Sequence, residues 1–323
     1  MNSLRVAFLG GGTMALRQAA ALLDAGLPRS GLVSVYDRDV AVAHAFADRF
    51  GATPMPSSRA ALQVASHVVI ATTAGSHASD AFEALTMRRG VFVEKPLALT
   101  VRDGAALTIL AERLSLPLHV GLSERFHPVV RALANSLANT VEARRVTRIE
   151  TVRNLRSMRA RDCSVAMNLA VHDVDLALTL THDGLTLDTT HAAHTVTGLS
   201  SFHARFIGAR GEAVSIAAAD GVSRDVRTIT VTVDSTTFEG DLLAGTLSQV
   251  AMGVRTPVLV ERVSGLVSQA SALLSVWTGR QALGPATARD AFRGLALLAR
   301  ATRTAHERAH RTPENLPPFG PFG

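Results

Sequence analysis

The first 122 residues alternate short apolar runs with amphipathic helical patterns, and this alternation restricts the possible folds more than any other feature of the chain. The spacing predicts helices over 39–50, 77–87 and 102–114. The apolar runs, which we expect to be strands, are 4–9, 32–36, 68–71, 91–94 and 117–121. Strands that alternate with helices predict βαβ units around a parallel sheet. We therefore expect a doubly wound α/β domain over residues 1–122.

From residue 123 the pattern changes, which predicts a second domain over 123–323. The expected helices lie near 128–138, 167–180, 257–278 and 287–307. The expected strands lie at 146–152 and near 192–197, 213–218 and 227–233. A segment rich in Pro and Gly, 313–323, follows and cannot continue a helix. No internal repeat or low-complexity linker marks the boundary.

Charge and composition exclude several classes of protein. The formal net charge is +6, but the arginines are spread along the chain, with a modest concentration between 144 and 161, and aromatic residues make up only 4%. This distribution argues against a nucleic-acid partner. One Cys, Cys163, excludes an internal disulfide framework and a Cys-based metal site. The N-terminal residues lack the apolar core of a signal peptide, and no charge-free run is long enough for a membrane helix. We expect a soluble, cytoplasmic protein without a membrane partner.

A glycine turn follows the first apolar run. The sequence Gly10-Gly-Gly-Thr-Met-Ala15 stands between a predicted strand and a predicted helix. Such a turn lets the backbone approach a pyrophosphate, whose charge the N-terminus of the helix stabilises. Asp37, 27 residues beyond Gly10, ends the second strand near the spacing at which a carboxylate accepts from ribose hydroxyls. These residues predict a Rossmann dinucleotide site that favours NAD, with NADP as the alternative if the adjacent Arg38 offsets the carboxylate.

The third informative strand ends in Glu94-Lys95-Pro96. In open parallel sheets, ligands bind at the carboxyl ends of the strands. Lys95 is the single lysine among the 33 cationic residues. Where arginine fills nearly every cationic position, one lysine indicates a site that needs a compact ammonium with an adjustable pKa. A surface ion pair before a helix is the alternative reading.

Several segments together resemble the Gfo/Idh/MocA family, that of glucose-fructose oxidoreductase and inositol dehydrogenase. The segments that carry the resemblance are the glycine turn with Asp37, 71–77, 92–100, 120–128, 166–176 and about 273–304. The resemblance implies an NAD(P)-dependent enzyme that acts on sugars or cyclitols. It also implies a C-terminal α/β domain with an open, mostly antiparallel sheet, whose face often forms a homodimer or homotetramer.

The resemblance also implies a catalytic pair, which falls on Lys95 and His172. The family has Asp four residues before its His, and this chain has Asn168 there. An amide can orient an imidazole, but it cannot stabilise imidazolium as a carboxylate does. A second departure is Thr73, where the family often has Pro. The segment Arg161-Asp-Cys-Ser-Val-Ala-Met-Asn168 further resembles UDP-N-acetylglucosamine 3-dehydrogenases, so a nucleotide-sugar is the leading substrate hypothesis.

The residues that the resemblance assigns to ligands form two groups. Expected cofactor contacts are Gly10, Gly12, Thr13, Met14, Asp37, Arg38, Thr72, Thr73, His77, Glu94 and Lys95. Expected substrate contacts are Lys95, Arg125, Arg156, Arg161 and His172. We expect no metal site, since the H-E-x-x-H match at 306–310 lies in an arginine-rich last helix with only Glu314 as a third ligand. His191 and His194 fall on opposite faces of a predicted strand.

Two alternatives to a dehydrogenase stay open at this stage. One is a non-catalytic regulatory protein that senses dinucleotide, to which the change at Asn168 points. The other is an imine or ketone reductase in which Lys95 and His172 donate protons. The presence of both Lys95 and His172 favours an enzyme.

Overall fold

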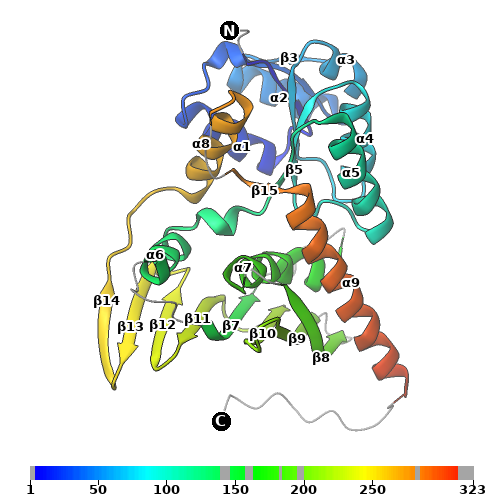
Figure 1. Cartoon of the computed structure of the whole chain (residues 1–323). Coiled ribbons are helices and arrows are strands. Elements are labelled where there is room, and N and C mark those ends of the chain that lie inside the picture. Colours follow the sequence, from blue (N-terminus) through cyan, green and yellow to red (C-terminus); the bar gives the residue numbers. More distant parts are fainter. Residues whose placement is uncertain are drawn as a thin grey trace.

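The computed structural model describes residues 4–138, 146–156, 163–181, 184–194, 200–280 and 284–311. Two sheets, each covered by helices, make up these residues (Figure 1). Arg161, part of the segment 144–161 and the segment 313–323 lie outside them. The predicted fold class, a parallel Rossmann sheet followed by an α/β domain with a mostly antiparallel sheet, is confirmed.

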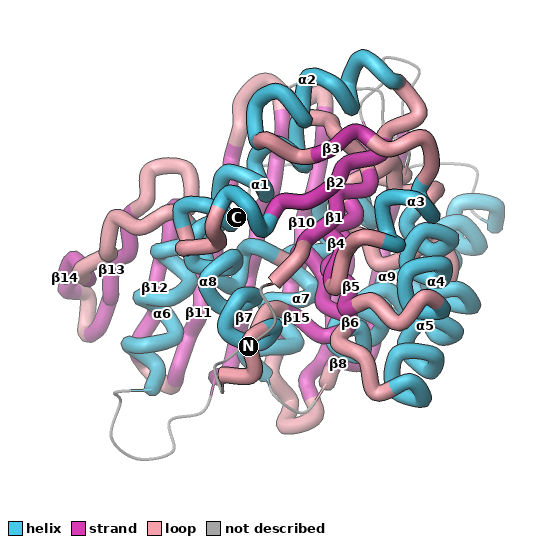
Figure 2. Tube along the Cα trace, turned by 90° about the horizontal axis from the view of Figure 1, so that it is seen from above, coloured by secondary structure: helices cyan, strands magenta, loops and turns pink. Residues whose placement is uncertain are grey.

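The first sheet is parallel over six strands, in the order β6-β5-β4-β1-β2-β3. These strands are β1 (Val6–Leu9), β2 (Leu32–Tyr36), β3 (Thr53–Pro54), β4 (His67–Ile70), β5 (Gly90–Glu94) and β6 (Leu118–Gly121). The residues of β1 and β5 are buried throughout, because helices cover both faces of the sheet (Figure 2).

Five helices connect these strands: α1 (Thr13–Asp24), α2 (Val40–Phe50), α3 (Ser58–Gln63), α4 (His77–Thr86) and α5 (Val101–Leu114). Side chains cap three of them: Asp39 accepts from the backbone of α2, Ser57 from α3 and Thr100 from α5. The N-terminus of α1 differs, because its N-cap is Gly12, which offers no side-chain acceptor. Its first backbone N–H groups therefore need an acceptor from elsewhere.

The second sheet has eight strands in the order β14-β13-β12-β11-β7-β10-β9-β8, antiparallel except between β7 and β10. The strands are β7 (Val146–Leu155), β8 (Leu185–His194), β9 (Ser200–Gly208), β10 (Ala213–Asp220), β11 (Val226–Val233), β12 (Thr236–Asp241), β13 (Thr246–Ala251) and β14 (Val254–Val258). The described helices α6 (Pro128–Ala138), α7 (Val171–Thr181) and α9 (Ala288–Arg311) lie against one face of it (Figure 1).

The C-terminal part of the chain returns to the first sheet. Helix α8 (Gly265–Trp277) packs on α1, and the short β15 (Ala286–Thr287) pairs antiparallel with β6. Helix α9 contacts both α5 and β8 and so joins the two layers. A division at residue 122 stays a prediction, but the segments 265–277 and 286–287 pack with the first domain.

Some predicted elements differ from the observed ones. A helix over 257–278 is wrong at its start, because 254–258 pairs with β13 as an edge strand, which tolerates Pro257. The helix begins only after Ser264, whose hydroxyl accepts from the backbone of Val267. Strands β9, β12, β13 and β14 were not expected. Their stability comes from pairing with distant strands, and local propensity indicates such partners poorly.

Candidate active site

A cavity of about 1010 Å³ opens between the two sheets. The first domain contributes the start of α1, the segments after β4 and β5, and the end of β6. The second contributes parts of β7, β11 and the segment that leads into α7. The lining residues lie within 12–17, 71–77, 94–96, 121–127, 153–155, 163–172, 225–227 and 264–266. The cavity is therefore placed at the carboxyl ends of the parallel strands, where open α/β sheets bind ligands.

The glycine turn closes one end of this cavity. Gly10 has φ +89°, and a Cβ there would lie 2.6 Å from the carbonyl oxygen of Ala71, so only glycine fits. Gly12, by contrast, has open space around it, and Gly12, Thr13 and Met14 line the cavity. The uncapped N-terminus of α1 thus points its N–H groups at a region where a pyrophosphate fits.

Asp37 holds the turn from the second strand. Its Oδ2 accepts from the Gly11 backbone at 2.8 Å, and its Oδ1 accepts from the Asp39 backbone at 2.9 Å. Each carboxylate oxygen keeps a further lone pair for a ribose hydroxyl. Asp37 does not line the cavity, and Arg38 beside it is exposed. Both follow β2 directly, next to the glycine turn.

Thr72, Thr73 and His77 line the cavity after β4. His77 is buried and faces two carbonyl oxygens, with Nδ1 2.7 Å from that of Pro96 and Nε2 3.1 Å from that of Thr72. The Thr72 hydroxyl donates to Asp80 at 2.7 Å. These contacts fix the segment after β4 against the segment after β5.

Glu94 lies at the floor of the cavity. Burial raises the pKa of its carboxyl, while the Gln18 amide, which donates to Oε1 at 2.6 Å, favours the ionised form. A Cβ on Gly121 would lie 2.8 Å from Glu94 Oε2, so glycine at the end of β6 makes room for this carboxyl. Sequence reasoning missed Gln18 and Gly121, although a second glycine at a strand end was a visible signal.

Lys95 follows directly and is anchored by the second domain. Its Nζ donates to the side-chain oxygen of Asn168 at 2.7 Å and to the backbone oxygen of Asn168 at 2.9 Å. The Lys95–Pro96 peptide bond is cis. Asn168 lies in a π-helical turn, Ala166–Ala170, directly before α7. Such turns frequently occur at functional sites because they redirect side chains.

His172 lines the same cavity one turn beyond Asn168. Burial lowers the pKa of its imidazole well below the usual range, and the positive charges of Arg153, Lys95 and Arg227 lower it further, whereas Glu124 acts in the opposite direction. The ring is therefore neutral near pH 7 and able to accept a proton. Its Nδ1 is buried and has no hydrogen-bond partner among the described residues.

A cluster of charged side chains surrounds His172. Arg153 on β7 makes a two-pronged contact with Asp173, at 2.8 and 3.0 Å, and its Nη1 lies 3.5 Å from Glu124. Arg227, its cross-strand neighbour on β11, donates to the same Glu124 oxygen at 2.5 Å. Burial alone would raise the pKa of Glu124, but these guanidinium groups and His172 bring it to about 2. Glu124 is therefore a carboxylate at every physiological pH.

Two predicted substrate contacts, Arg125 and Arg156, do not line the cavity. Arg125 is paired through two hydrogen bonds with Asp175, at 2.6 and 2.7 Å, and also contacts Asp290, so it joins α7 to α9. The Arg156 side chain is exposed and does not line the cavity. Arg161 lies outside the described residues. The arginines that do line the cavity are Arg17, Arg153 and Arg227.

The histidines of the H-E-x-x-H match, for which no metal site was expected, and those of the predicted strand are placed as follows. His306 and Glu307 are exposed on α9, His191 is exposed on β8, and the side chains of His194 and His310 are outside the described set. Within the part of the chain that the structure describes, no three His, Cys, Asp or Glu residues are arranged to hold a metal ion. None of the helices in those residues is long and apolar enough to cross a membrane.

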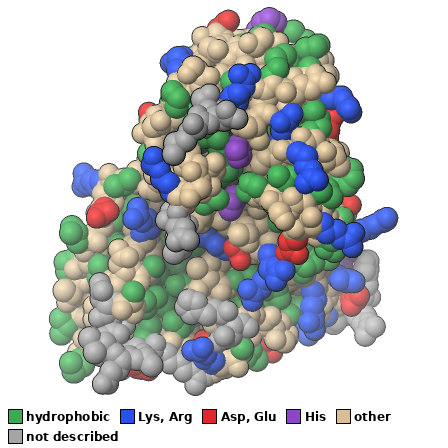
Figure 3. All heavy atoms as spheres, turned by 45° about the horizontal axis from the view of Figure 1, so that its top comes forward, with side chains coloured by type: hydrophobic (Ala, Val, Ile, Leu, Met, Phe, Trp, Pro, Cys, Tyr) green, Lys and Arg blue, Asp and Glu red, His purple; other side chains and the backbone are tan. Residues whose placement is uncertain are grey.

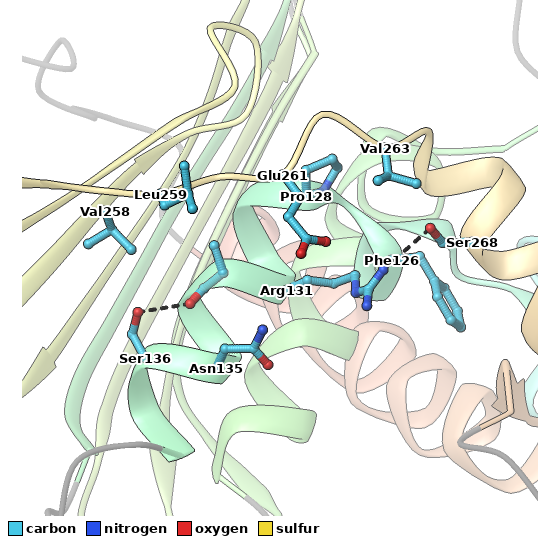
Figure 4. A pocket seen from close by; sticks show the side chains of 11 residues that line it. Phe126, Pro128, Arg131, Asn135, Ser136, Val258, Leu259, Glu261, Val263 and Ser268 are labelled. Carbon is cyan, nitrogen blue, oxygen red and sulfur yellow. Dashed lines mark hydrogen bonds between the residues drawn. The ribbon is translucent and has the colours of Figure 1, made fainter.

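A second cavity, of about 270 Å³, lies between α6 and the segment that connects β14 to α8 (Figure 4). It is lined mainly by apolar and small polar side chains, and of its two charged residues Arg131 contacts Ser268. Its charged residues are Arg131 and Glu261, and neither a histidine nor a lysine lines it. Lys and Arg side chains are scattered over the face in Figure 3 and do not form one basic patch. The large cavity is thus the better candidate for an active site.

Comparison with known proteins identifies the first domain. Residues 4–122 match a family model described as oxidoreductase family, NAD-binding Rossmann fold. This match is to the Gfo/Idh/MocA family, and it covers only the first domain. The predicted NAD-type cofactor agrees with that description, and the residues around the α1 N-terminus fit such a group. A structure of an oxidoreductase from Agrobacterium radiobacter with NAD+ has a TM-score of 0.83 to this chain at 17% identity, and covers 95% of this chain and 97% of its own.

Two curated relatives are sugar dehydrogenases. Glucose-6-phosphate 3-dehydrogenase of Bacillus subtilis is 26% identical over 42% of this chain and 38% of its own length. UDP-N-acetylglucosamine 3-dehydrogenase of Acidithiobacillus ferrooxidans is 29% identical over 47% of each. The chain thus matches less than half the length of these relatives. A solved structure of the latter enzyme has a TM-score of 0.84 at 23% identity and covers 94% of this chain and 98% of its own, so it shares the fold across both domains.

Sequence reasoning missed Glu124, Arg153 and Arg227 as a group. Only Arg153 could have been suspected from the sequence, because it continues the alternation of the buried positions Ile149 and Thr151 of β7. An arginine on a buried strand face needs a partner. Its partners come from Asp173 on α7 and from Glu124 after β6. No local pattern connects these three positions.

Proposed function

We propose that the chain is an NAD(P)-dependent dehydrogenase that moves hydride between nicotinamide and a secondary alcohol of a sugar or nucleotide-sugar. One observation carries the proposal: a single cavity brings together the N-terminus of α1, Lys95 from the first domain and His172 from the second. The nicotinamide, when bound, accepts the hydride. The remaining chemistry is proton transfer and charge stabilisation by this chain's own side chains.

In the direction of oxidation, His172 accepts the hydroxyl proton at Nε2. The lowered pKa keeps this nitrogen unprotonated beforehand. Lys95 Nζ donates to the same oxygen and stabilises the negative charge that develops on it. The two oxygens of Asn168 hold Nζ in place. Cofactor and substrate bound in the cavity would displace water from it, and a drier site strengthens these interactions.

A nucleotide-sugar is the substrate that we favour. Two observations support it: the names of the relatives, and the presence of Arg17 and Arg227 along the cavity, where guanidinium groups suit phosphate oxygens. We favour NAD over NADP because the Asp37 carboxylate repels a 2′-phosphate, with Arg38 as the residue that would reverse the preference. We also propose a homodimer or homotetramer in the cytoplasm, formed through the sheet face that no described helix covers.

Turnover by purified variants tests the proposal. NAD and NADP are supplied with a panel of UDP-sugars and sugar phosphates, and reduced cofactor is measured by absorbance. We expect turnover by the wild type and its loss in Lys95→Met and His172→Ala. Arg131→Met, in the second cavity, is the matched control and should keep the wild-type rate. Wild-type rates in both active-site variants would refute the assignment.

The same experiment separates the non-catalytic alternative, to which Asn168 points. A dinucleotide sensor binds cofactor but reduces none of it with any member of the panel. Binding of NAD measured by calorimetry, together with no turnover, would favour the sensor. An imine or ketone reductase would instead consume NADPH without oxidising any alcohol at neutral pH.

A further inference from the structure

The position one turn before His172, where a carboxylate would stabilise the protonated imidazole, is occupied by Asn168. An imidazole that accepts a proton becomes a cation. In a buried site already surrounded by Lys95, Arg153 and Arg227, that cation is unfavourable. The Asn168 side-chain oxygen carries no full charge and already accepts a hydrogen bond from Lys95 Nζ at 2.7 Å, so it does not neutralise a positive charge on His172. A negative charge must come from another element.

Glu124 is a carboxylate in the right place. It belongs to the short 3₁₀ turn Ser123–Phe126 after β6, lines the same cavity as His172 and is only 8% exposed. Its Oε1 is occupied by Arg227 at 2.5 Å and Arg153 at 3.5 Å. Its Oε2 is buried and has no hydrogen-bond partner among the described residues. The Nδ1 atom of His172 is likewise buried without a hydrogen-bond partner among the described residues. Buried polar atoms without a partner are uncommon in proteins, because they destabilise the folded state.

We propose that Glu124 is a positioning residue that takes the place of the missing carboxylate and stabilises the imidazolium form of His172. This inference rests on the proposed dehydrogenase function. In the oxidation step, the hydroxyl proton moves to His172 Nε2, and the two electrons leave the substrate carbon as hydride to the bound nicotinamide. The resulting positive ring shares the cavity with the Glu124 carboxylate, whose charge favours the protonated form, and we expect Nδ1–H to donate toward Oε2.

The two arginines explain why Glu124 stays ionised and fixed. Arg153 and Arg227 are direct cross-strand neighbours on β7 and β11, and like charges in that position repel unless an anion lies between them. Glu124 bridges them, so its charge and its orientation are set by residues of the second sheet. Asp173 is taken by Arg153 through two hydrogen bonds and cannot serve His172 in the same way. The remaining titratable residues of the cavity are Arg17, His77, Glu94, Lys95, His127, Cys163 and Asp225.

The opposite charges of Glu124 and Arg227 give a test that a merely structural role would fail. Glu124→Gln removes the negative charge and should move the protonation midpoint of His172 to lower pH. Arg227→Gln removes a positive charge and should move it to higher pH. Loss of packing or of the ion pair alone would affect both variants in the same direction. Asp225→Asn, a carboxylate elsewhere in the cavity, is the matched control.

The midpoint is read without turnover, by NMR titration of isotope-labelled histidine ring carbons, with His172→Gln to assign the signal. We expect the midpoint of Glu124→Gln to lie about one pH unit below that of the wild type. A larger shift would move it below the accessible pH range, while the wild-type inflection stays within that range. Midpoints that agree, or that shift in one direction for both variants, overturn the proposal. Absence of an inflection in the wild type also overturns the proposal. If Glu124 stabilises the imidazolium, that form must appear within the pH range in which the protein is folded.

Kinetics then separate this inference from the proposed function. For an active wild type, the acid limb of kcat/KM should move with the NMR midpoint in each variant, and kcat of Glu124→Gln should fall at least about tenfold. A wild type that turns over no sugar refutes the dehydrogenase function, while the titration still decides whether Glu124 controls the charge of His172. Normal kcat and an unmoved limb in Glu124→Gln refute the inference alone.

Discussion

Replacing Asp173 with asparagine should destabilise the protein far more than the loss of one surface ion pair. Asp173 and Arg153 are both buried, with side-chain exposures of 5% and 7%, and two hydrogen bonds of 2.8 and 3.0 Å join them. The variant leaves the guanidinium buried with one amide oxygen and the more distant Glu124 as its partners. Breaking a buried pair from one side costs about 3–5 kcal/mol, because the remaining charge stays desolvated.

Glu112→Gln provides the matched comparison. It removes a carboxylate that Arg289 contacts at 2.8 Å, but these side chains are 49% and 71% exposed. An exposed pair contributes about 0–1 kcal/mol, because water and salt screen it. Urea denaturation followed by far-UV circular dichroism measures the free energy of unfolding of both variants and the wild type. If Asp173→Asn lost no more stability than Glu112→Gln, the reasoning about the buried cluster would be refuted.

Three further predictions concern the turn, the lysine and a buried histidine. Gly10→Ala should weaken NAD binding and lower the melting temperature, because φ is +89° and the new Cβ would lie 2.6 Å from the Ala71 oxygen. Gly12→Ala places its Cβ in open space and should change stability little. Calorimetry measures the binding and thermal melts measure the stability of both variants. Lys95→Arg should keep the fold but lose most turnover, since a guanidinium does not match the two oxygens that now hold the compact Nζ; steady-state rates and circular dichroism check this. Burial lowers the pKa of His67 to about 4, so between about pH 6.5 and pH 4 the unfolded chain binds a proton that the folded protein does not, and the free energy of unfolding falls as the pH falls. The melting temperature of His67→Gln should therefore drop less between pH 7 and pH 5 than that of the wild type. An equal drop would contradict this.

The first domain was largely predictable because its signals are local. A fully buried parallel strand is apolar throughout, and a tight turn at positive φ requires glycine, so β1 and Gly10 are visible in the sequence. The strand at 32–36 was predicted with the observed bounds, Leu32–Tyr36. The structure also brings Lys95, Asn168 and His172 to one cavity, as the resemblance implies.

The second sheet was harder to predict because its strands depend on partners far away in the chain. Arg153 and Arg227 are neighbours only through the register of β7 and β11, and Glu124 meets them from the end of the first sheet. Arg125 illustrates the opposite problem. Its position in the resembling segment indicated a substrate contact, whereas the structure pairs it with Asp175 and Asp290. Which arginine faces the cavity is decided by tertiary packing.

The transfer of a labelled hydride tests the central claim most directly. UDP-N-acetylglucosamine deuterated at every ring carbon is incubated with the protein and NAD, and the reduced nicotinamide is analysed by mass spectrometry. The account predicts that wild-type protein produces NADH with one deuterium, and that His172→Ala produces almost none. Reduced cofactor without deuterium, or none at all from the wild type, would contradict hydride transfer from a sugar carbon at this site.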